Sequence, residues 1–322
     1  MGSSMRWRRS GAAMRASLGR SACPGNPGGS PRLRAMDPSP PQFVSAPEID
    51  AQYNAAAAVA DSVERLRRHG ELSAEARARL RCSEGIAYGP TLDETLDVFP
   101  AEAAAAPVFV FIHGGYWRRF AARDYHLVAL GLVPLGITTV CVDYSLCPKV
   151  TIDEIVRQCR AAVAWTRRRI GEHGGDPARV AVGGHSAGGH LTAMCLAARW
   201  DEDYGLGRDP LAAAVLVSGI YDLEPLRRSY LQPTIQLDDG IVRRNSPMFG
   251  VRPCATPALV TWGADESAEF ARQATQYHVA WQDAGNRGEL LPQPGANHFT
   301  AIEGLADPES ALSRWLAAKL VA

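Results

Sequence analysis

The spacing of hydrophobic residues changes along the chain. Over residues 46–80, apolar positions recur at helical spacing, with the alanine-rich stretch 55–60 as a strong helix former and Gly70 as the expected break. Two short runs at 85–88 and 95–99 instead have the character of strands. We therefore expect a helical N-terminal segment followed by a pair of antiparallel strands.

Beyond residue 100, short apolar runs alternate with helical segments. Strands are expected at 107–112, 137–142, 179–183, 213–218, 258–262 and 289–291. The expected helices span 124–135 and 153–170, follow Ser186, run up to about residue 284, and begin again near Pro308. This order indicates an α/β fold, a mostly parallel central sheet with helices on both faces. Functional residues of such folds lie beyond the carboxyl ends of the strands.

Residues 223–253 interrupt this alternation. The stretch contains four prolines and mixed charges without a clear period. Long irregular segments of compact domains are often lids or binding loops. We predict one α/β domain over residues 41–322 that carries a small cap at 223–253.

Charge is distributed unevenly along the chain. The formal net charge is zero, yet residues 1–35 hold seven arginines and no acid, which leaves 27 Lys and Arg against 34 Asp and Glu. A body with that excess of acid is a poor binder of nucleic acid. Residues 1–40 lack an apolar period, and we expect a disordered basic tail there. The alternatives are an organelle transit peptide, an interaction arm, or an over-long start with Met36 as the true first residue.

The cysteines bear on the compartment. Their number, seven, is odd and includes no C-x-x-C pair, which favours reduced thiols and a cytoplasmic protein over a disulfide framework or a zinc site. No apolar run is long enough for a transmembrane span. Without an H-E-x-x-H or phosphate-binding glycine motif, we expect no metal and no cofactor. We expect a small-molecule substrate, with no nucleic acid or membrane as partner, and the oligomeric state stays open, a homodimer included.

An apolar run at 180–183 leads directly into Gly184-His185-Ser186-Ala187-Gly188, and a helical segment follows. This is the G-x-S-x-G pattern of a nucleophile elbow, in which a sharp turn between strand and helix exposes the serine. Gly184 and Gly188 allow the strand and helix to pass closely, because neither carries a Cβ. Ser186 is therefore the candidate nucleophile.

A glycine loop follows the strand expected at 107–112, with the sequence His113-Gly114-Gly115-Tyr116-Trp117. The amides of Gly114 and Gly115, with that of Ala187 after the serine, are candidates for an oxyanion hole. His113 precedes the nucleophile, so we expect it to brace the loop through hydrogen bonds rather than act as the base. Tyr116, Trp117 and His185 are candidates to line the substrate cleft, with plain packing as the alternative.

The acid and the base are expected after the serine, in the order serine, acid, histidine. Asp265 and Glu266 follow the strand at 258–262, and either carboxylate could orient an imidazole. Chemistry alone does not choose between them. His298 lies between the last expected strand and the last expected helix, where the base is required.

Together these motifs resemble the α/β-hydrolase superfamily and, within it, the serine-dependent kynurenine formamidase (arylformamidase) family. The resemblance extends from about Ile49 to the C-terminus. The motifs that carry it are His113–Trp117, Gly184–Gly188 and Asn297-His298-Phe299, with weaker support from Ser218-Gly219-Ile220-Tyr221-Asp222-Leu223 and Glu269-Phe270-Ala271-Arg272-Gln273.

The resemblance also bears on the acid. Its register places the carboxylate three residues after Gly263 and four before Phe270, which is Glu266, with Asp265 as the alternative. A glutamate there departs from the usual aspartate of the family. The implied reaction is hydrolysis of N-formyl-kynurenine to kynurenine and formate through a formyl-serine intermediate, a step of tryptophan catabolism. The alternatives are a carboxylesterase acting on small acyl esters and a non-catalytic binding protein with a hydrolase fold.

Overall fold

The central element is an eight-stranded sheet. The computed structural model describes residues 45–321, so the basic tail predicted over residues 1–40 lies outside the described residues. The strand order is β1-β2-β4-β3-β5-β6-β7-β8, with antiparallel pairing of β1 with β2 and of β2 with β4 and parallel pairing elsewhere. The strands are β1 (Ser83–Ala87), β2 (Thr95–Phe99), β3 (Ala106–Ile112), β4 (Thr138–Val142), β5 (Gly175–His185), β6 (Ala214–Val217), β7 (Ala258–Gly263) and β8 (Gly288–Gln293). The predicted α/β fold with a mostly parallel sheet is confirmed.

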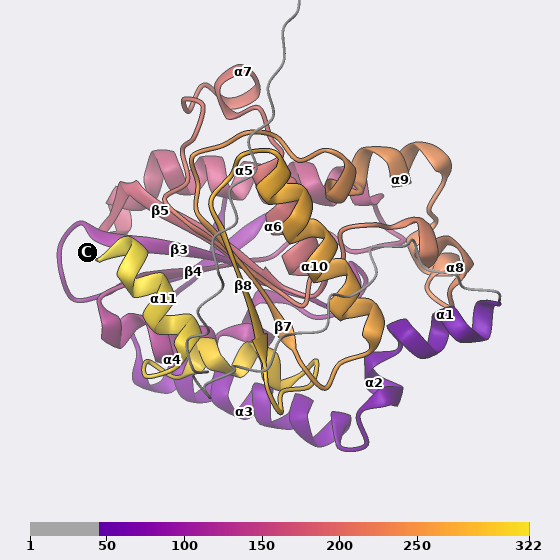
Figure 1. Cartoon of the computed structure of the whole chain (residues 1–322). Helices are drawn as coiled ribbons and strands as arrows, with labels where there is room; N and C mark the ends of the chain where they lie inside the picture. Colours follow the sequence, from indigo (N-terminus) through magenta and orange to yellow (C-terminus); the bar gives the residue numbers. More distant parts are fainter. Residues whose placement is uncertain (1–44, 322) are drawn as a thin grey trace, which may run out of the picture. The chain divides into compact units, whose positions relative to one another are not determined.

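Helices cover both faces of this sheet (Figure 1). One face packs against α5 (Ile152–Arg169), α6 (Ala187–Leu196) and α10 (Ala268–Asp283), and the other against α3 (Ser62–Arg79), α4 (Val128–Leu132) and α11 (Ala311–Leu320). The alternation of side chains along β3 supplies both cores. Val108 and Val110 belong to the first core, and Phe109 and Phe111 belong to the second. Because both faces are covered, β3 is apolar throughout, as expected of a central parallel strand.

The N-terminal helical segment is divided differently from the prediction. It forms α1 (Ala46–Tyr53), α2 (Ala55–Ala58) and α3, and α3 continues through Gly70. Breaks fall at Asn54 and at residues 59–61. The Asn54 side chain accepts a hydrogen bond from the amide of Ala57 at 3.2 Å and so caps α2. A glycine costs a helix only about 1 kcal/mol, and burial of Ser73 in the next turn holds α3 in place.

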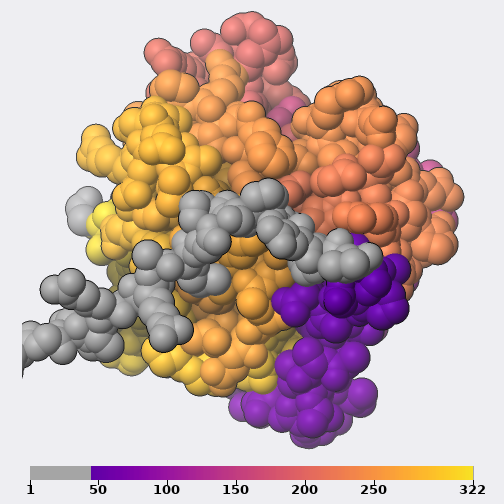
Figure 2. Space-filling model, turned by 45° about the vertical axis from the view of Figure 1, so that its right-hand side comes forward, coloured from indigo at the N-terminus to yellow at the C-terminus, as the bar shows by residue number. Residues whose placement is uncertain are grey.

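The segment 223–253 consists of short helices. These are η4 (Glu224–Arg228), α8 (Gln232–Ile235), α9 (Asp239–Asn245) and η5 (Pro247–Phe249). The segment contacts α1, α5, α6 and α10, and Figure 2 shows it beside the N-terminal helices. That this segment acts as a cap stays a prediction. Within residues 45–321, no helix combines the length and the apolar character needed to cross a membrane.

Two helical glycines provide a test of this packing. A Cβ on Gly131 in α4 would lie 2.4 Å from the carbonyl oxygen of Leu305, whereas a Cβ on Gly70 would have nothing within 4 Å. We expect Gly131→Ala to lower the free energy of unfolding by about 2 kcal/mol through overpacking. Gly70→Ala should raise it by about 0.5–1 kcal/mol through helix propensity. Urea denaturation of both variants beside the wild type measures this, and equal stability of the two would contradict the packing.

Candidate active site

Ser186 occupies a strained turn between β5 and α6. Its backbone angles are φ 58° and ψ −118°, and its amide donates to the carbonyl of Val217 at 2.8 Å. Positive φ is unfavourable for a residue with a side chain and is held only where neighbouring structure enforces it. Here a Cβ on Gly184 would lie 2.4 Å from backbone atoms of Gly188, and a Cβ on Gly188 would lie 1.9 Å from the carbonyl oxygen of Ile112. Glycine is therefore required on both sides of the turn.

The glycine loop after β3 lies directly against this turn. A Cβ on Gly114 would be 2.8 Å from the carbonyl oxygen of His185, and Gly115 has a φ of +106°. Gly115 and Ser186 line the same pocket. The amide of Ala187 is the first of α6, and the first amides of a helix have no partner within it. The three predicted oxyanion-hole residues thus lie around the serine.

His113 braces the loop, as the sequence predicts. Its Nδ1 donates to the carbonyl of Gly114 at 2.7 Å, and its ring stacks on Tyr144 with centroids 4.2 Å apart. The hydroxyl of Tyr144 donates to the carbonyl of His113 at 2.9 Å. Burial lowers the pKa of His113 to about 4, so the imidazole is neutral at pH 7. These contacts hold the two carbonyls of the loop in place.

Glu266, and not Asp265, pairs with the histidine. Nδ1 of His298 donates to Oε2 of Glu266 at 2.6 Å, and the Glu266 side chain is only 1% exposed. The other carboxylate oxygen accepts from the amide of Gly263 at 2.7 Å and from the hydroxyl of Ser218 at 2.5 Å. Asp265 is exposed to solvent. Of the two carboxylates that the residue chemistry left open, the buried and fully hydrogen-bonded one orients the imidazole.

Ser186 and His298 line one pocket. Tyr116 and His185, two of the three candidates, also line it. Trp117 does not, which corrects that expectation: it is fully buried and donates from Nε1 to Nδ1 of His190 at 3.2 Å. The remaining walls include four aromatic side chains and two arginines, with two alanines, a leucine and a histidine completing the lining. They comprise Phe120, Tyr125, Tyr230, Phe299, Arg118, Arg119, Ala55, Ala56, Leu66 and His69.

His185 contacts both the backbone and the ring of His298. Its Nε2 donates to the carbonyl of His298 at 2.8 Å, and the centroids of the two rings are 4.7 Å apart. Burial holds the pKa of His185 well below its ordinary value, so its ring is neutral. Residues 45–321 contain no group of three His, Cys, Asp or Glu side chains arranged to hold a metal ion. The arrangement of serine, histidine, carboxylate and loop amides is suited to acyl transfer through a covalent intermediate.

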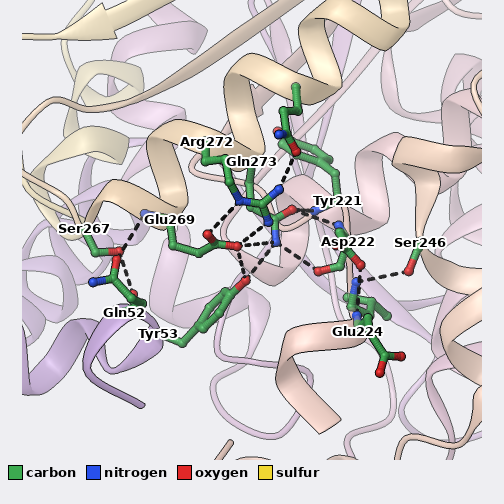
Figure 3. Close-up of polar contacts among 12 residues, drawn as sticks. Gln52, Tyr53, Tyr221, Asp222, Glu224, Ser246, Ser267, Glu269, Arg272 and Gln273 are labelled. Carbon is green, nitrogen blue, oxygen red and sulfur yellow. Dashed lines mark hydrogen bonds and ion pairs between the residues drawn. The ribbon is translucent and has the colours of Figure 1, made fainter. Parts of the chain in front are cut away.

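A buried polar network lies beside the site, and the sequence did not predict the roles of its residues (Figure 3). Tyr53 of α1 donates to Oε1 of Glu269 at 2.6 Å, and Arg272 donates from Nε to Oε2 of the same carboxylate at 2.8 Å. Gln273 accepts at 2.7 Å from the amide of Tyr221, which follows β6. In the sequence, the segments 218–223 and 269–273 indicate only a resemblance to the family. In the structure they form one network.

This network fixes the turn that carries the acid. Ser267, next to Glu266, donates to the carbonyl of Gln52 at 2.6 Å, and the hydroxyl of Tyr116 donates to the carbonyl of Tyr53. Helix α1 is thereby joined to the acid turn and to the glycine loop. The residues that follow it, at 55–56, line the pocket.

Comparison with known proteins places the chain among hydrolases. The α/β-hydrolase fold family matches residues 109–301. A kynurenine formamidase of Danio rerio is 31% identical over 72% of this chain and 79% of its own length. Esterase LipC of Mycobacterium tuberculosis is 30% identical over 68% of this chain and 60% of its own length. A crystal structure from Silicibacter sp. TM1040, provisionally described as a thioesterase, has a TM-score of 0.73 and 28% identity, and covers 85% of this chain and 99% of that chain.

The two adjacent carboxylates can be separated by mutation. We expect Glu266→Gln to lower kcat by about 10⁴-fold, because an amide no longer fixes the tautomer of His298 or stabilises the imidazolium. Asp265→Asn, the matched control, should stay within about twofold of the wild type because Asp265 is exposed. Steady-state hydrolysis of p-nitrophenyl acetate measures both, with circular dichroism to verify folding. A loss on Asp265→Asn as large as that on Glu266→Gln would refute the pairing.

Proposed function

The chain belongs to the α/β-hydrolase family and is a hydrolase of amide or ester bonds, and from this premise we propose that its substrate is N-formyl-kynurenine, which it cleaves to kynurenine and formate. The observation that carries the proposal is the single pocket that Ser186 and His298 share with Gly115, in a chain whose relatives include kynurenine formamidases. A formyl group needs little space beyond the glycine loop, so the aromatic walls remain for the arylamine.

The first half of the reaction forms the covalent intermediate. The hydroxyl oxygen of Ser186 attacks the formyl carbon while Nε2 of His298 takes the hydroxyl proton. Glu266 holds the opposite ring nitrogen and stabilises the imidazolium. The negative charge that develops on the formyl oxygen is stabilised by the amides of Gly114, Gly115 and Ala187, which is typically the largest single contribution in such sites.

The second half releases both products. When the tetrahedral intermediate collapses, the carbon–nitrogen bond breaks and His298 gives its proton to the departing arylamine nitrogen. A water molecule then attacks the formyl ester of Ser186, again with His298 as the base, and formate leaves as the serine regains its proton. No metal or cofactor is needed for either half.

A carboxylesterase acting on small acyl esters is the second candidate. The relative LipC favours it, and the same serine, histidine and loop amides serve both bonds. A non-catalytic binding protein is disfavoured, because such proteins normally lack a member of the catalytic set and here all are present. We also propose a cytoplasmic enzyme that acts on a small molecule, supported by the odd cysteine number without a C-x-x-C pair.

A substrate comparison tests the proposal. We expect kcat/KM for N-formyl-kynurenine to exceed that for a short p-nitrophenyl ester. Ser186→Ala should lower kcat by about 10⁶-fold, because the nucleophile is lost. Ser83→Ala, at an exposed position of β1, is the control and should be fully active. A strong preference for the ester would establish the second candidate instead, and a Ser186→Ala protein as active as the wild type would establish the binding protein.

A further inference from the structure

Two arginines face the pocket of Ser186 without a carboxylate partner. Arg118 is half-buried and Arg119 is exposed, and both line this pocket. Among residues 45–321, neither takes part in an ion pair. Residues 36–322 contain more acids than bases, so carboxylates are abundant in this part of the chain. The site therefore holds two positive charges, of Arg118 and Arg119, that no carboxylate of the described residues pairs with.

The backbone holds Arg118 in this place at a cost in strain. Tyr116 and Trp117 both have positive φ, 51° and 55°, a region that costs a residue with a side chain on the order of 1 kcal/mol or more. The turn is closed by the amide of Arg118, which donates to the carbonyl of Gly115 at 3.1 Å. Trp117 anchors it, because its carbonyl accepts from the amide of Cys147 at 2.7 Å and its ring is buried. The glycine loop and Arg118 are thus parts of one rigid turn.

The guanidinium itself is incompletely satisfied. It lies over the ring of Tyr230, 5.6 Å from the centroid. Its Nε is buried and has no hydrogen-bond partner, a state that is costly for a donor. A carboxylate that binds an arginine in the bidentate manner takes Nε–H and one Nη–H together. Such an anion would satisfy this donor while the guanidinium keeps its contact with Tyr230.

We propose that Arg118, assisted by Arg119, binds a carboxylate on the leaving group of the substrate. The enzyme then selects formamides whose aromatic amine carries a carboxylate over formamides that lack one. This inference rests on the proposed function, because N-formyl-kynurenine has an α-carboxylate on the chain attached to its ring. Arg119 contributes less than Arg118 because it is exposed to solvent, which screens its charge.

The test compares two formamides of which only one carries the carboxylate. N-formyl-kynurenine is set against 2′-formamidoacetophenone, which keeps the ring, the ketone and the formamide but lacks the amino acid part. We expect Arg118→Gln to lower the ratio of their kcat/KM values by about 10- to 100-fold, mainly through KM, as expected for loss of a charge-assisted hydrogen bond. Arg119→Gln should change the ratio a few-fold, and Arg118→Lys should restore part of the preference.

Arg287 provides the control. It is exposed and directly precedes β8, so it lies at the amino ends of the parallel strands, away from their carboxyl ends. Arg287→Gln should therefore leave the ratio unchanged. Equal losses on both formamides with Arg118→Gln would show that Arg118 only supports the turn. No loss on either would show that it has no role in binding. Both outcomes overturn the proposal.

A further pair of substrates separates this inference from the proposed function. If the wild type cleaves neither formamide, the formamidase assignment fails, and the arginines are tested with phenyl acetate and (4-acetoxyphenyl)acetate, esters that differ by a carboxylate on the leaving group. A preference for the acidic ester that Arg118→Gln removes would still support the carboxylate site. Binding of kynurenine to Ser186→Ala, with and without Arg118→Gln, gives a measurement without turnover, in which an unchanged Kd would overturn it.

Discussion

The active site depends on a direct contact between two pieces of backbone, the turn after β5 and the end of β3. Ile112 and Gly184 are opposite each other in the parallel pairing of these strands, and the first turn of α6 then passes over the carbonyl of Ile112 so closely that a Cβ on Gly188 would be 1.9 Å from it. Any side chain at Gly188 would push α6 away and relax the strained serine. Because the same approach brings Gly114 against His185, one steric constraint places both the nucleophile and the loop amides.

A second constraint is polar and buried. Glu269 and Arg272 form an ion pair whose side chains are 3% and 10% exposed. Such pairs are costly unless each remaining donor and acceptor is satisfied, and here Tyr53 and Gln273 complete the hydrogen bonding. The main effect of the network is to fix positions, because it joins α1 to α10, the helix that follows Glu266. This group of side chains (Figure 3) therefore ties α1, which precedes the pocket-lining residues 55–56, to α10, which begins just after Glu266.

The histidines of the site have different electrostatic surroundings and different roles. Burial lowers the pKa values of His113 and His190 to about 4 and holds that of His185 well below its ordinary value, so these rings serve as neutral hydrogen-bonding groups. His298 instead donates from Nδ1 to the buried carboxylate of Glu266 at 2.6 Å. The same fold supports many acyl substrates through this machinery, so selectivity rests on what lines the rim. In this chain the pocket lining includes Arg118, held beside the glycine loop in one turn.

The sequence by itself determined the elements whose signals are local. The period of the apolar runs predicted the sheet, and the glycines around Ser186 and in the loop after β3 predicted turns that only glycine permits. It did not locate the helix breaks at Asn54 and at 59–61. Gly70 costs a helix little, whereas the Asn54 side chain caps α2 by accepting from the amide of Ala57. Residue chemistry alone left Asp265 and Glu266 open and only the register of the resemblance favoured Glu266, because adjacent carboxylates are distinguished by which one the fold buries against His298. Whether Trp117 or Arg118 faces the pocket was likewise decided by contacts with His190, Cys147 and Tyr230, residues distant in the chain. Side-chain direction and burial are properties of the packed tertiary structure, and only that structure could decide them.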